Sequence, residues 1–222
     1  MLKKDTLDFL VALQGNNNRE WFTENKKWYE RARADFEILV GQLIQSIAMF
    51  DSEIGLLNPK KCMFRIYRDT RFAADKTPYK TNFGAVFRPH IAGRLSGYYL
   101  HLSPEEIFIS YGQYMLMPDQ LKKMRRGIYN DFEMLEEIIK EKKFKKEIGD
   151  LYRDEDMLQR VPNGFDKNHP AAEYLKLKHF YALKPVTQEQ LFSDDFVAFA
   201  TDMYKIMQPL GRFLDDILEE DI

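Results

Sequence analysis

The sequence predicts an α+β fold, an antiparallel sheet of about four to five strands packed on one face by N-terminal and C-terminal helices. Two observations lead to this prediction. Helical periodicity dominates both ends of the chain, whereas its middle third falls into short strand-like runs separated by proline, glycine and serine. Such short connections between consecutive strands favour an antiparallel meander. Because no repeat, linker or low-complexity tract interrupts this pattern, we expect residues 1–222 to form a single domain.

Two helices are expected before the sheet. Residues 6–14 form a short one with Thr6 as its cap, and the following run of one glycine and three asparagines ends it. A long helix is expected over residues 19–49, where aromatic and aliphatic side chains recur at helical spacing. Asn17 and Glu20 have the spacing of a capping box at its start.

Four strand-like runs follow in the middle of the chain, and a fifth comes later. The first two are separated by an ordered loop over residues 68–81, and turn signals separate the others. The runs are residues 62–67, 82–88, 98–102, 106–111 and 179–186.

The second half of the chain is mainly helical. Thr187 and Gln190 have capping-box spacing, and Pro209 is expected to kink or split the last helix. Residues 149–168 look irregular. The expected helices are residues 118–140, 142–148, 170–178 and about 193–219.

Composition excludes several classes of protein. The chain is 45% apolar and 31% charged, with a net charge of −2, so nothing predicts a global attraction to nucleic acid or acidic membranes. No stretch approaches the roughly 18 uncharged apolar residues of a membrane helix, and the N-terminus lacks a signal-peptide pattern. The single cysteine, Cys62, cannot form an intramolecular disulfide, and we expect a cytoplasmic protein.

The middle third is locally basic. Residues 60–94 carry nine cations and only two anions, a net charge of +7 on an otherwise acidic chain. Arginine offers a planar fork for phosphate or carboxylate, and tyrosine offers a hydroxyl donor. We therefore predict that a small anionic ligand binds here. The candidate residues are Arg65, Tyr67, Arg68, Arg71, Lys76, Tyr79, Lys80, Tyr99 and His101.

Strand alternation brings some of these candidates together. Successive side chains of a strand point to opposite faces, so Phe64 and Leu100 would face the helices with their apolar neighbours. The polar side chains of the same two runs would then collect on the other face. These are Arg65, Tyr67, Tyr99 and His101. The grouping depends on strand register, which one residue of slip reverses.

Three other interpretations stay open. Arg68, Arg71 and the nearby aspartates could form a structural ion-pair network, in which case the protein is a scaffold or interaction domain. His101 is a candidate general acid or base, although the sequence does not decide whether the protein is an enzyme. Arginines interleaved with aromatic side chains also suit single-stranded nucleic acid, against which the overall charge argues.

Neither a metal nor another cofactor is expected. His90, His169 and His179 show no metal-ligand spacing to each other or to Cys62. Phosphate-cradling and nucleophile-elbow motifs are also absent from the sequence.

Several segments resemble the domain of unknown function 2461 family. The resemblance covers nearly the whole chain and implies one compact domain in a cytoplasmic, bacterial-type protein. It implies no activity. A departure is the single Gly112, where the family often has a glycine pair. The resembling segments are residues 17–22, 65–72, 75–81, 98–104, 112–114, 160–164 and 169–170.

Overall fold

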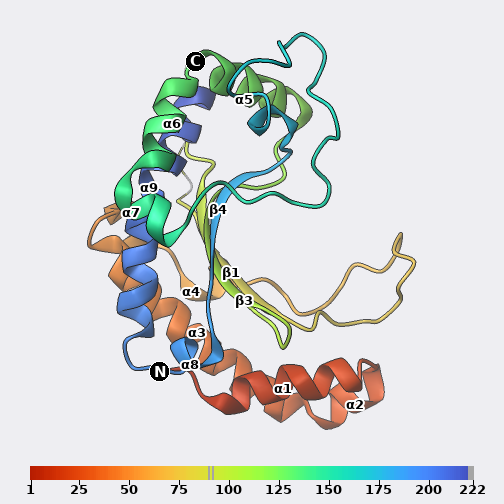
Figure 1. Ribbon diagram of the computed structural model, residues 1–222. Coiled ribbons are helices and arrows are strands. Elements are labelled where there is room, and N and C mark those ends of the chain that lie inside the picture. Colours follow the sequence, from red (N-terminus) through yellow and green to blue (C-terminus); the bar gives the residue numbers. More distant parts are fainter. Residues whose placement is uncertain (90, 92, 220–222) are drawn as a thin grey trace. The chain divides into compact units, whose positions relative to one another are not determined.

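The computed structural model describes residues 1–89, 91 and 93–219, and its described residues form one open antiparallel sheet (Figure 1). The sheet order is β1-β2-β3-β4, a meander, so the predicted α+β class is confirmed. The strands correspond to the last four predicted runs. They are β1 (Phe83–Phe87), β2 (Gly97–Leu102), β3 (Ile107–Gln113) and β4 (Phe180–Pro185).

The chain divides into two compact units, and the boundaries fall at the end of β1 and inside β2, β3, β4 and the last helix. We describe each unit separately, and the single-domain prediction stays a prediction. The first unit comprises residues 1–87, 99–109 and 185–202, and the second comprises residues 88–98, 110–184 and 203–222.

Helices at the N-terminus build the core of the first unit. Phe9 is fully buried, and its ring lies 6.2 Å from Trp21 and 6.3 Å from Phe83 of β1. Phe36 also packs on Phe83, with ring centroids 5.4 Å apart. The helices of this unit are α1 (Lys4–Gly15), α2 (Arg19–Glu24), α3 (Lys26–Ala48), η1 (Ser52–Leu56), α4 (Pro59–Cys62) and α8 (Gln188–Leu191).

The second unit has an aromatic core and a buried carboxylate. Tyr98 stacks on Tyr111 at 4.0 Å, and Tyr204 meets Tyr98 edge-on at 5.2 Å. Asp215, which is 5% exposed, accepts a hydrogen bond from the Gln113 side chain. Its helices are α5 (Pro118–Asn130), α6 (Phe132–Lys140), α7 (Lys142–Glu147), η2 (Tyr174–Lys176) and most of α9 (Phe196–Glu219).

The helix predictions fail in detail at four places. The predicted helix 19–49 breaks at Asn25, where φ is −98° and ψ is 14°, and the Trp21 carbonyl there accepts both the backbone N–H and the side-chain amide of Asn25. The helix 118–140 breaks at Asp131, where φ is −112° and ψ is 34°. Residues 170–178 form turns and a short 3-10 helix, and the first helix begins before Thr6. Pro209 lies inside α9, which continues past it, and the predicted kink stays a prediction.

The predicted first strand, residues 62–67, is wrong as a regular strand. The Asn58 side chain caps a short helix, α4, that extends to Cys62. The chain beyond it is extended but makes only isolated antiparallel bridges, Met63 to Ala85 and Tyr67 to Tyr79. It therefore pairs first with β1 and then with its own returning segment, and neither pairing is long enough to form a ladder.

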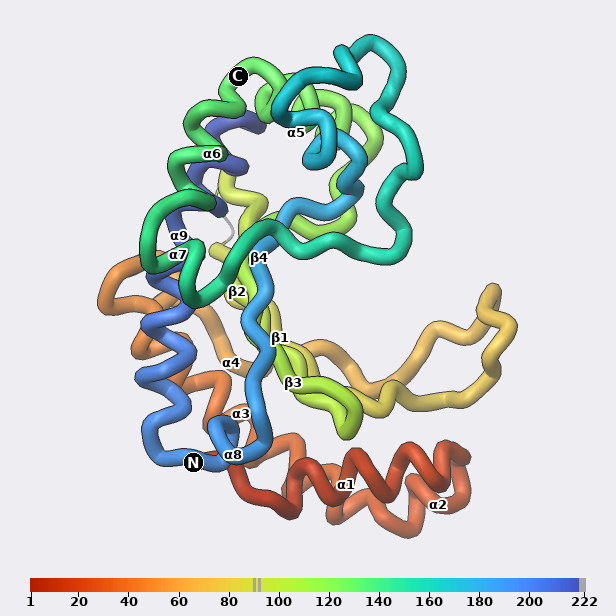
Figure 2. Tube along the Cα trace, viewed as in Figure 1, coloured from red at the N-terminus to blue at the C-terminus, as the bar shows by residue number. Residues whose placement is uncertain are grey.

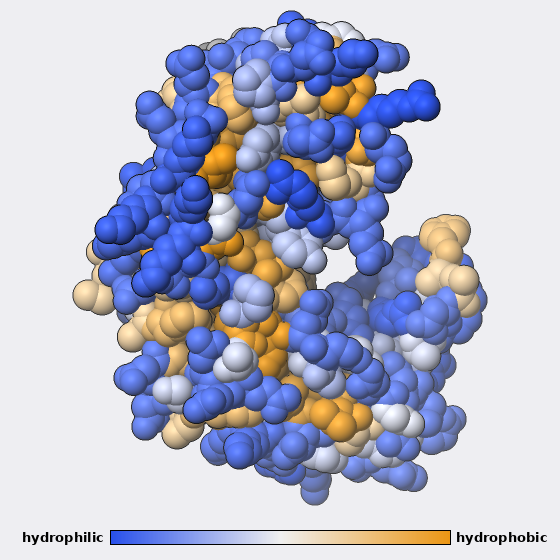
Figure 3. Space-filling view, in the orientation of Figure 1, coloured by the Kyte–Doolittle hydropathy of each residue, from blue (hydrophilic) through white to orange (hydrophobic). Residues whose placement is uncertain are grey.

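Beyond the second bridge the chain forms an arm, residues 68–78. Figures 1 and 2 show this segment extending away from the strands and folding back toward β1. Phe72 of the arm is 95% exposed, and Figure 3 shows hydrophobic residues at the end of the arm. A bilayer-spanning helix, which needs about 20 apolar residues, is not found among the described residues.

Candidate functional site

Asn17 fastens the base of the arm to the N-terminal helices. Its side-chain amide donates to the Tyr79 carbonyl at 2.9 Å, and its side-chain oxygen accepts the Tyr79 N–H at 3.1 Å. This reciprocal pair imitates one step of a sheet ladder. The expected capping box at Asn17 and Glu20 is wrong, because Asn18 is the cap and accepts the Trp21 N–H.

We expect Asn17→Ala to lower the free energy of unfolding by about 1–2 kcal/mol, because two partly buried backbone groups of Tyr79 lose their partners. Chemical denaturation measures this change. Hydrogen exchange should accelerate at the Tyr79 amide. Asn16→Ala is the matched control, since the Asn16 side chain bonds only the Ala12 carbonyl of its own helix. Equal effects of the two substitutions would contradict the role of Asn17.

The arm neutralises most of its own charge. The Arg68 guanidinium donates to Asp75 and Thr77, and Arg71 grips Asp69 with two nitrogens at 3.0 and 2.8 Å. The backbone N–H of Thr77, and next Arg68, lower the pKa of Asp75 to about 2. These cations are therefore engaged inside the arm.

Lys76 is also engaged, because its ammonium donates to the Thr70 carbonyl at 2.9 Å. It lies beside a polar hollow of about 470 Å³ between the arm and the start of α2. Arg19 and Glu20 of α2 line the same hollow, so a cation and an anion face it from one helix. Thr77 lines it as well, but the hydroxyl already bonds Asp75.

Arg65 and Lys80 differ from the cations of the arm. Among the described residues, neither has a carboxylate within ion-pair distance. Burial, and next the positive charge of Arg65, lower the pKa of Lys80. The Lys80 ammonium instead lies 5.3 Å from the centre of the Phe64 ring, a cation–π contact. The charge of Arg65 also acts on Asp69, but the Asp69 oxygens are bonded to Arg71. Among the described residues, neither Arg65 nor Lys80 is therefore paired directly with an acid.

An aromatic stripe begins at Phe64 and crosses the sheet. Phe64 lies 6.1 Å from Tyr99, Tyr99 lies 5.8 Å from Phe108, and Phe108 stacks on His101 at 4.7 Å with ring planes only 6° apart. Gly84 of β1 makes room for it, because a Cβ at that position would lie 2.6 Å from the Tyr99 hydroxyl. The four rings, Phe64, Tyr99, Phe108 and His101, are called the stripe below.

His101 is held as a neutral imidazole within the stripe. Burial lowers its pKa to about 4, and its side chain is 15% exposed. Its Nδ1 shares a hydrogen bond with the Tyr99 hydroxyl at 3.0 Å, and its Nε2 lies 3.8 Å from Glu106. At neutral pH this ring offers hydrogen bonding and stacking. Burial disfavours the second ring proton that would make it positively charged. Its assignment as an acid or base stays a prediction.

The structure divides the predicted site residues among three places. Arg68, Arg71 and Lys76 belong to the arm. Tyr79 is 6% exposed and stacks on Phe22 at 3.9 Å, with the half-exposed Tyr67 beside it. Of the remaining four candidates, Tyr99 and His101 belong to the stripe and Lys80 contacts its Phe64 ring. The charge of Arg65 acts on Lys80.

The expected grouping of side chains on the sheet needs one correction. Phe64, and not Arg65 or Tyr67, is the residue of the first run that contacts Tyr99. The side-chain alternation in β2 itself is as predicted, with Tyr98, Leu100 and Leu102 buried and Tyr99 and His101 opposite. The wrong part of the prediction concerns residues 63–67. Their pairing with β1 is interrupted, and Phe64, which was expected to face the helices, contacts Tyr99 instead.

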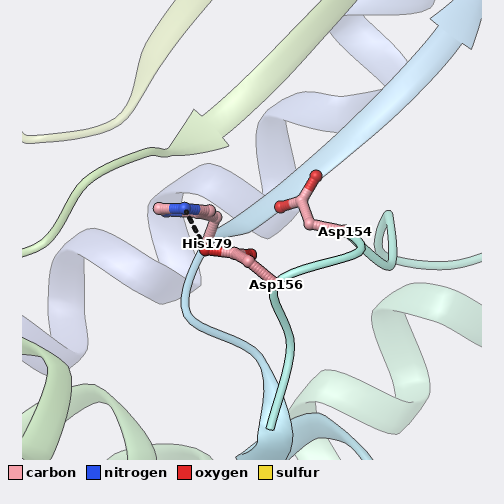
Figure 4. Close-up of side chains that lie close together, drawn as sticks. All are labelled: Asp154, Asp156 and His179. Atoms are coloured by element: carbon pink, nitrogen blue, oxygen red, sulfur yellow. Dashed lines mark ion pairs between the residues drawn. The ribbon is translucent and has the colours of Figure 1, made fainter. Parts of the chain in front are cut away.

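A second cluster, in the other unit, has the composition of a metal site. Figure 4 shows His179, just before β4, beside Asp154 and Asp156 of a neighbouring segment. The His179 Nδ1 accepts the Met115 N–H at 3.0 Å, so in the neutral ring the proton sits on Nε2, which faces Asp156 at 3.6 Å. A metal would need that Nε2 lone pair, and metal-bound histidines normally donate from their other nitrogen.

The two aspartates of this cluster also have partners of their own. The Tyr181 hydroxyl donates to Asp154 at 2.7 Å, and Lys178 lies 3.5 Å from Asp156. Burial, and next the bond to Asp154, raise the pKa of Tyr181. These hydrogen bonds and ion pairs therefore join the start of β4, and the two residues before it, to residues 150–156. This cluster was missed in the sequence because the spacing of histidines was compared and the aspartates were not considered. His90, which that comparison included, lies outside the described residues.

A comparison with known protein families identifies this chain over most of its length. The model of the family described as conserved hypothetical protein (DUF2461) matches residues 5–213. The chain belongs to the DUF2461 family. No curated protein and no solved structure matches it.

The DUF2461 match includes every residue of the arm and of the stripe. The family description names no reaction and no ligand, so function has to be argued from the site itself. The single Gly112, where the chain departs from the expected glycine pair, lies in β3 with φ of 145°. A Cβ there would lie 2.6 Å from the Tyr181 Cα, so this glycine lets β4 approach β3.

Proposed function

We propose that this DUF2461 protein binds a small anionic ligand, bearing phosphate or carboxylate, through Arg65 and Lys80. One observation carries the proposal: among the described residues neither of these neighbouring cations has a carboxylate within ion-pair distance, whereas Arg68 and Arg71 of the arm each do. Two like charges held together destabilise each other, and an anion between them relieves that repulsion. Charge-assisted hydrogen bonds to both would be the main source of affinity.

The cations of the arm have a supporting role in this proposal. Arg68 and Arg71 are committed to Asp75 and Asp69, so they shape the arm and leave its net charge low. Asn17 holds Tyr79, the residue before Lys80. The arm thereby fixes the position of Lys80 next to Arg65.

Isothermal titration with methyl phosphate and with acetate tests the proposal. We expect Arg65→Ala and Lys80→Ala each to weaken binding about tenfold or more, because each removes one charge-assisted hydrogen bond. Arg71→Ala is the matched control and should bind like the wild type, since Asp69 already balances that charge. Binding equally weakened by all three substitutions, or no binding by the wild type, would refute the site.

A scaffold role is the second candidate, and the paired cations of the arm favour it. If the arm is only a structural element, no small anion will raise the melting temperature, while Asn17→Ala will still lower it. We infer a cytoplasmic, bacterial-type setting for either role. The support is the family resemblance and the single cysteine, Cys62, which is buried. The site does not specify a reaction.

A further inference from the structure

We propose that the ligand of the Arg65–Lys80 site carries a flat ring next to its anionic group, and that the ring stacks on Phe64 at the exposed end of the stripe. This inference rests on the proposed function. Phe64 is 47% exposed, with Tyr99 at 6.1 Å and the Lys80 ammonium at 5.3 Å from its ring. An apolar ring left this open beside a cation that has no carboxylate partner is the surface that a ring-bearing anion would cover.

Lys80 provides the link between the two parts of the site. Its ammonium now lies over the Phe64 ring, which is a weaker interaction at an exposed position than a charge-assisted hydrogen bond. An arriving anion would therefore draw the ammonium away from the ring. That movement uncovers the face of Phe64, so binding of the anion and stacking of an attached ring are coupled through one side chain.

The far end of the stripe limits what else can bind. Glu106 lies 3.8 Å from His101, and the negative charge of Glu105 acts on the same imidazole. The stripe thus runs from two cations to two carboxylates. A single-stranded nucleic acid that placed one phosphate at Arg65 would bring a later one toward these acids, which repel it. One ring with one anionic group, as in a nucleoside monophosphate, fits this charge gradient better than a polymer.

Matched ligands separate the ring from the anion. Isothermal titration should give phenyl phosphate about tenfold tighter binding than methyl phosphate, the size expected of one aromatic stack. Phe64→Ala should remove that advantage without weakening methyl phosphate binding, because the Lys80 ammonium then has no ring contact to give up. Phe64→Leu keeps the bulk of the side chain without the aromatic ring and should lose the same advantage. It replaces the alanine variant in this test if that variant folds poorly. Phe72→Ala is the control, an exposed phenylalanine of the arm outside the stripe.

Each outcome identifies which claim fails. Equal affinities for the two phosphates overturn the ring inference and leave the anion site standing. Absence of binding by both phosphates overturns the anion site and the ring inference with it. An oligothymidylate that binds more tightly than adenosine monophosphate, with a steep salt dependence, overturns the small-ligand assignment in favour of single-stranded nucleic acid.

Discussion

Replacing Gly211 with alanine is expected to destabilise this protein by about 3 kcal/mol, although the same change inside a helix normally stabilises. Gly211 lies within α9 against Tyr111, which is fully buried and stacked on Tyr98. A Cβ at position 211 would lie 2.8 Å from the Tyr111 Cδ1 and still closer to the rest of the ring edge. The ring cannot move aside without losing its stacking on Tyr98, so α9 has to shift.

Gly41→Ala is the matched control for this prediction. Gly41 also lies inside a helix, α3, but the nearest atom to its added Cβ would be the Pro59 Cγ at an ordinary 3.7 Å. Helix propensity should then dominate, and the control should gain up to about 1 kcal/mol. Urea denaturation of both variants gives the comparison. Stabilisation by both substitutions would mean that the Tyr111 ring is free to rearrange.

Local patterns predicted the strands well because each strand carries its own alternation. In β2 the buried residues Tyr98, Leu100 and Leu102 alternate with the half-buried Tyr99 and His101, and the sequence of this run alone indicates as much. Helix ends were less predictable. The break at Asn25 accompanies a side-chain hydrogen bond to the Trp21 carbonyl, whereas the apolar periodicity continues through this residue.

The candidate site was predictable in composition but not in arrangement. Charge counting located the basic segment, and an ion-pair network of Arg68, Arg71 and the nearby aspartates was one of the open interpretations, but the particular pair of Arg71 with Asp69 was not specified. The partner of Tyr99 was not predictable, because it depends on pairing between residues 63–67 and two different segments. The bond between Asn17 and Tyr79 joins residues 62 positions apart, and no local pattern indicates it.

Asp215→Ala is expected to cost about 3–4 kcal/mol, since it removes one oxygen that serves two buried donors and one partly buried donor. The Asp215 Oδ1 accepts the Leu95 N–H at 3.1 Å, the Ser96 N–H at 2.8 Å and the Gln113 side-chain amide at 3.0 Å. Asp215→Asn keeps an oxygen acceptor and should cost only about 1 kcal/mol. Urea denaturation at neutral pH measures both. Equal losses would mean that the negative charge, and not the acceptor, stabilises this unit.

The pH dependence of the Asp215→Asn comparison tests which force governs the buried carboxyl. Burial raises its pKa above the usual 3.8, against the opposing effect of hydrogen bonds led by the Ser96 N–H. Between the unfolded value and the raised folded value, the folded protein holds more protons than the unfolded chain, so this contribution to stability falls as pH rises through that window. Asparagine has no such proton.

The wild type should therefore gain stability relative to Asp215→Asn as pH falls from neutral toward 3.8. The opposite slope would mean that the three donors hold the carboxyl in its charged form more strongly than burial disfavours it. In that case the folded protein would keep a negative charge inside its second unit at every pH where it is stable, and the larger cost of Asp215→Ala would include the loss of that charge.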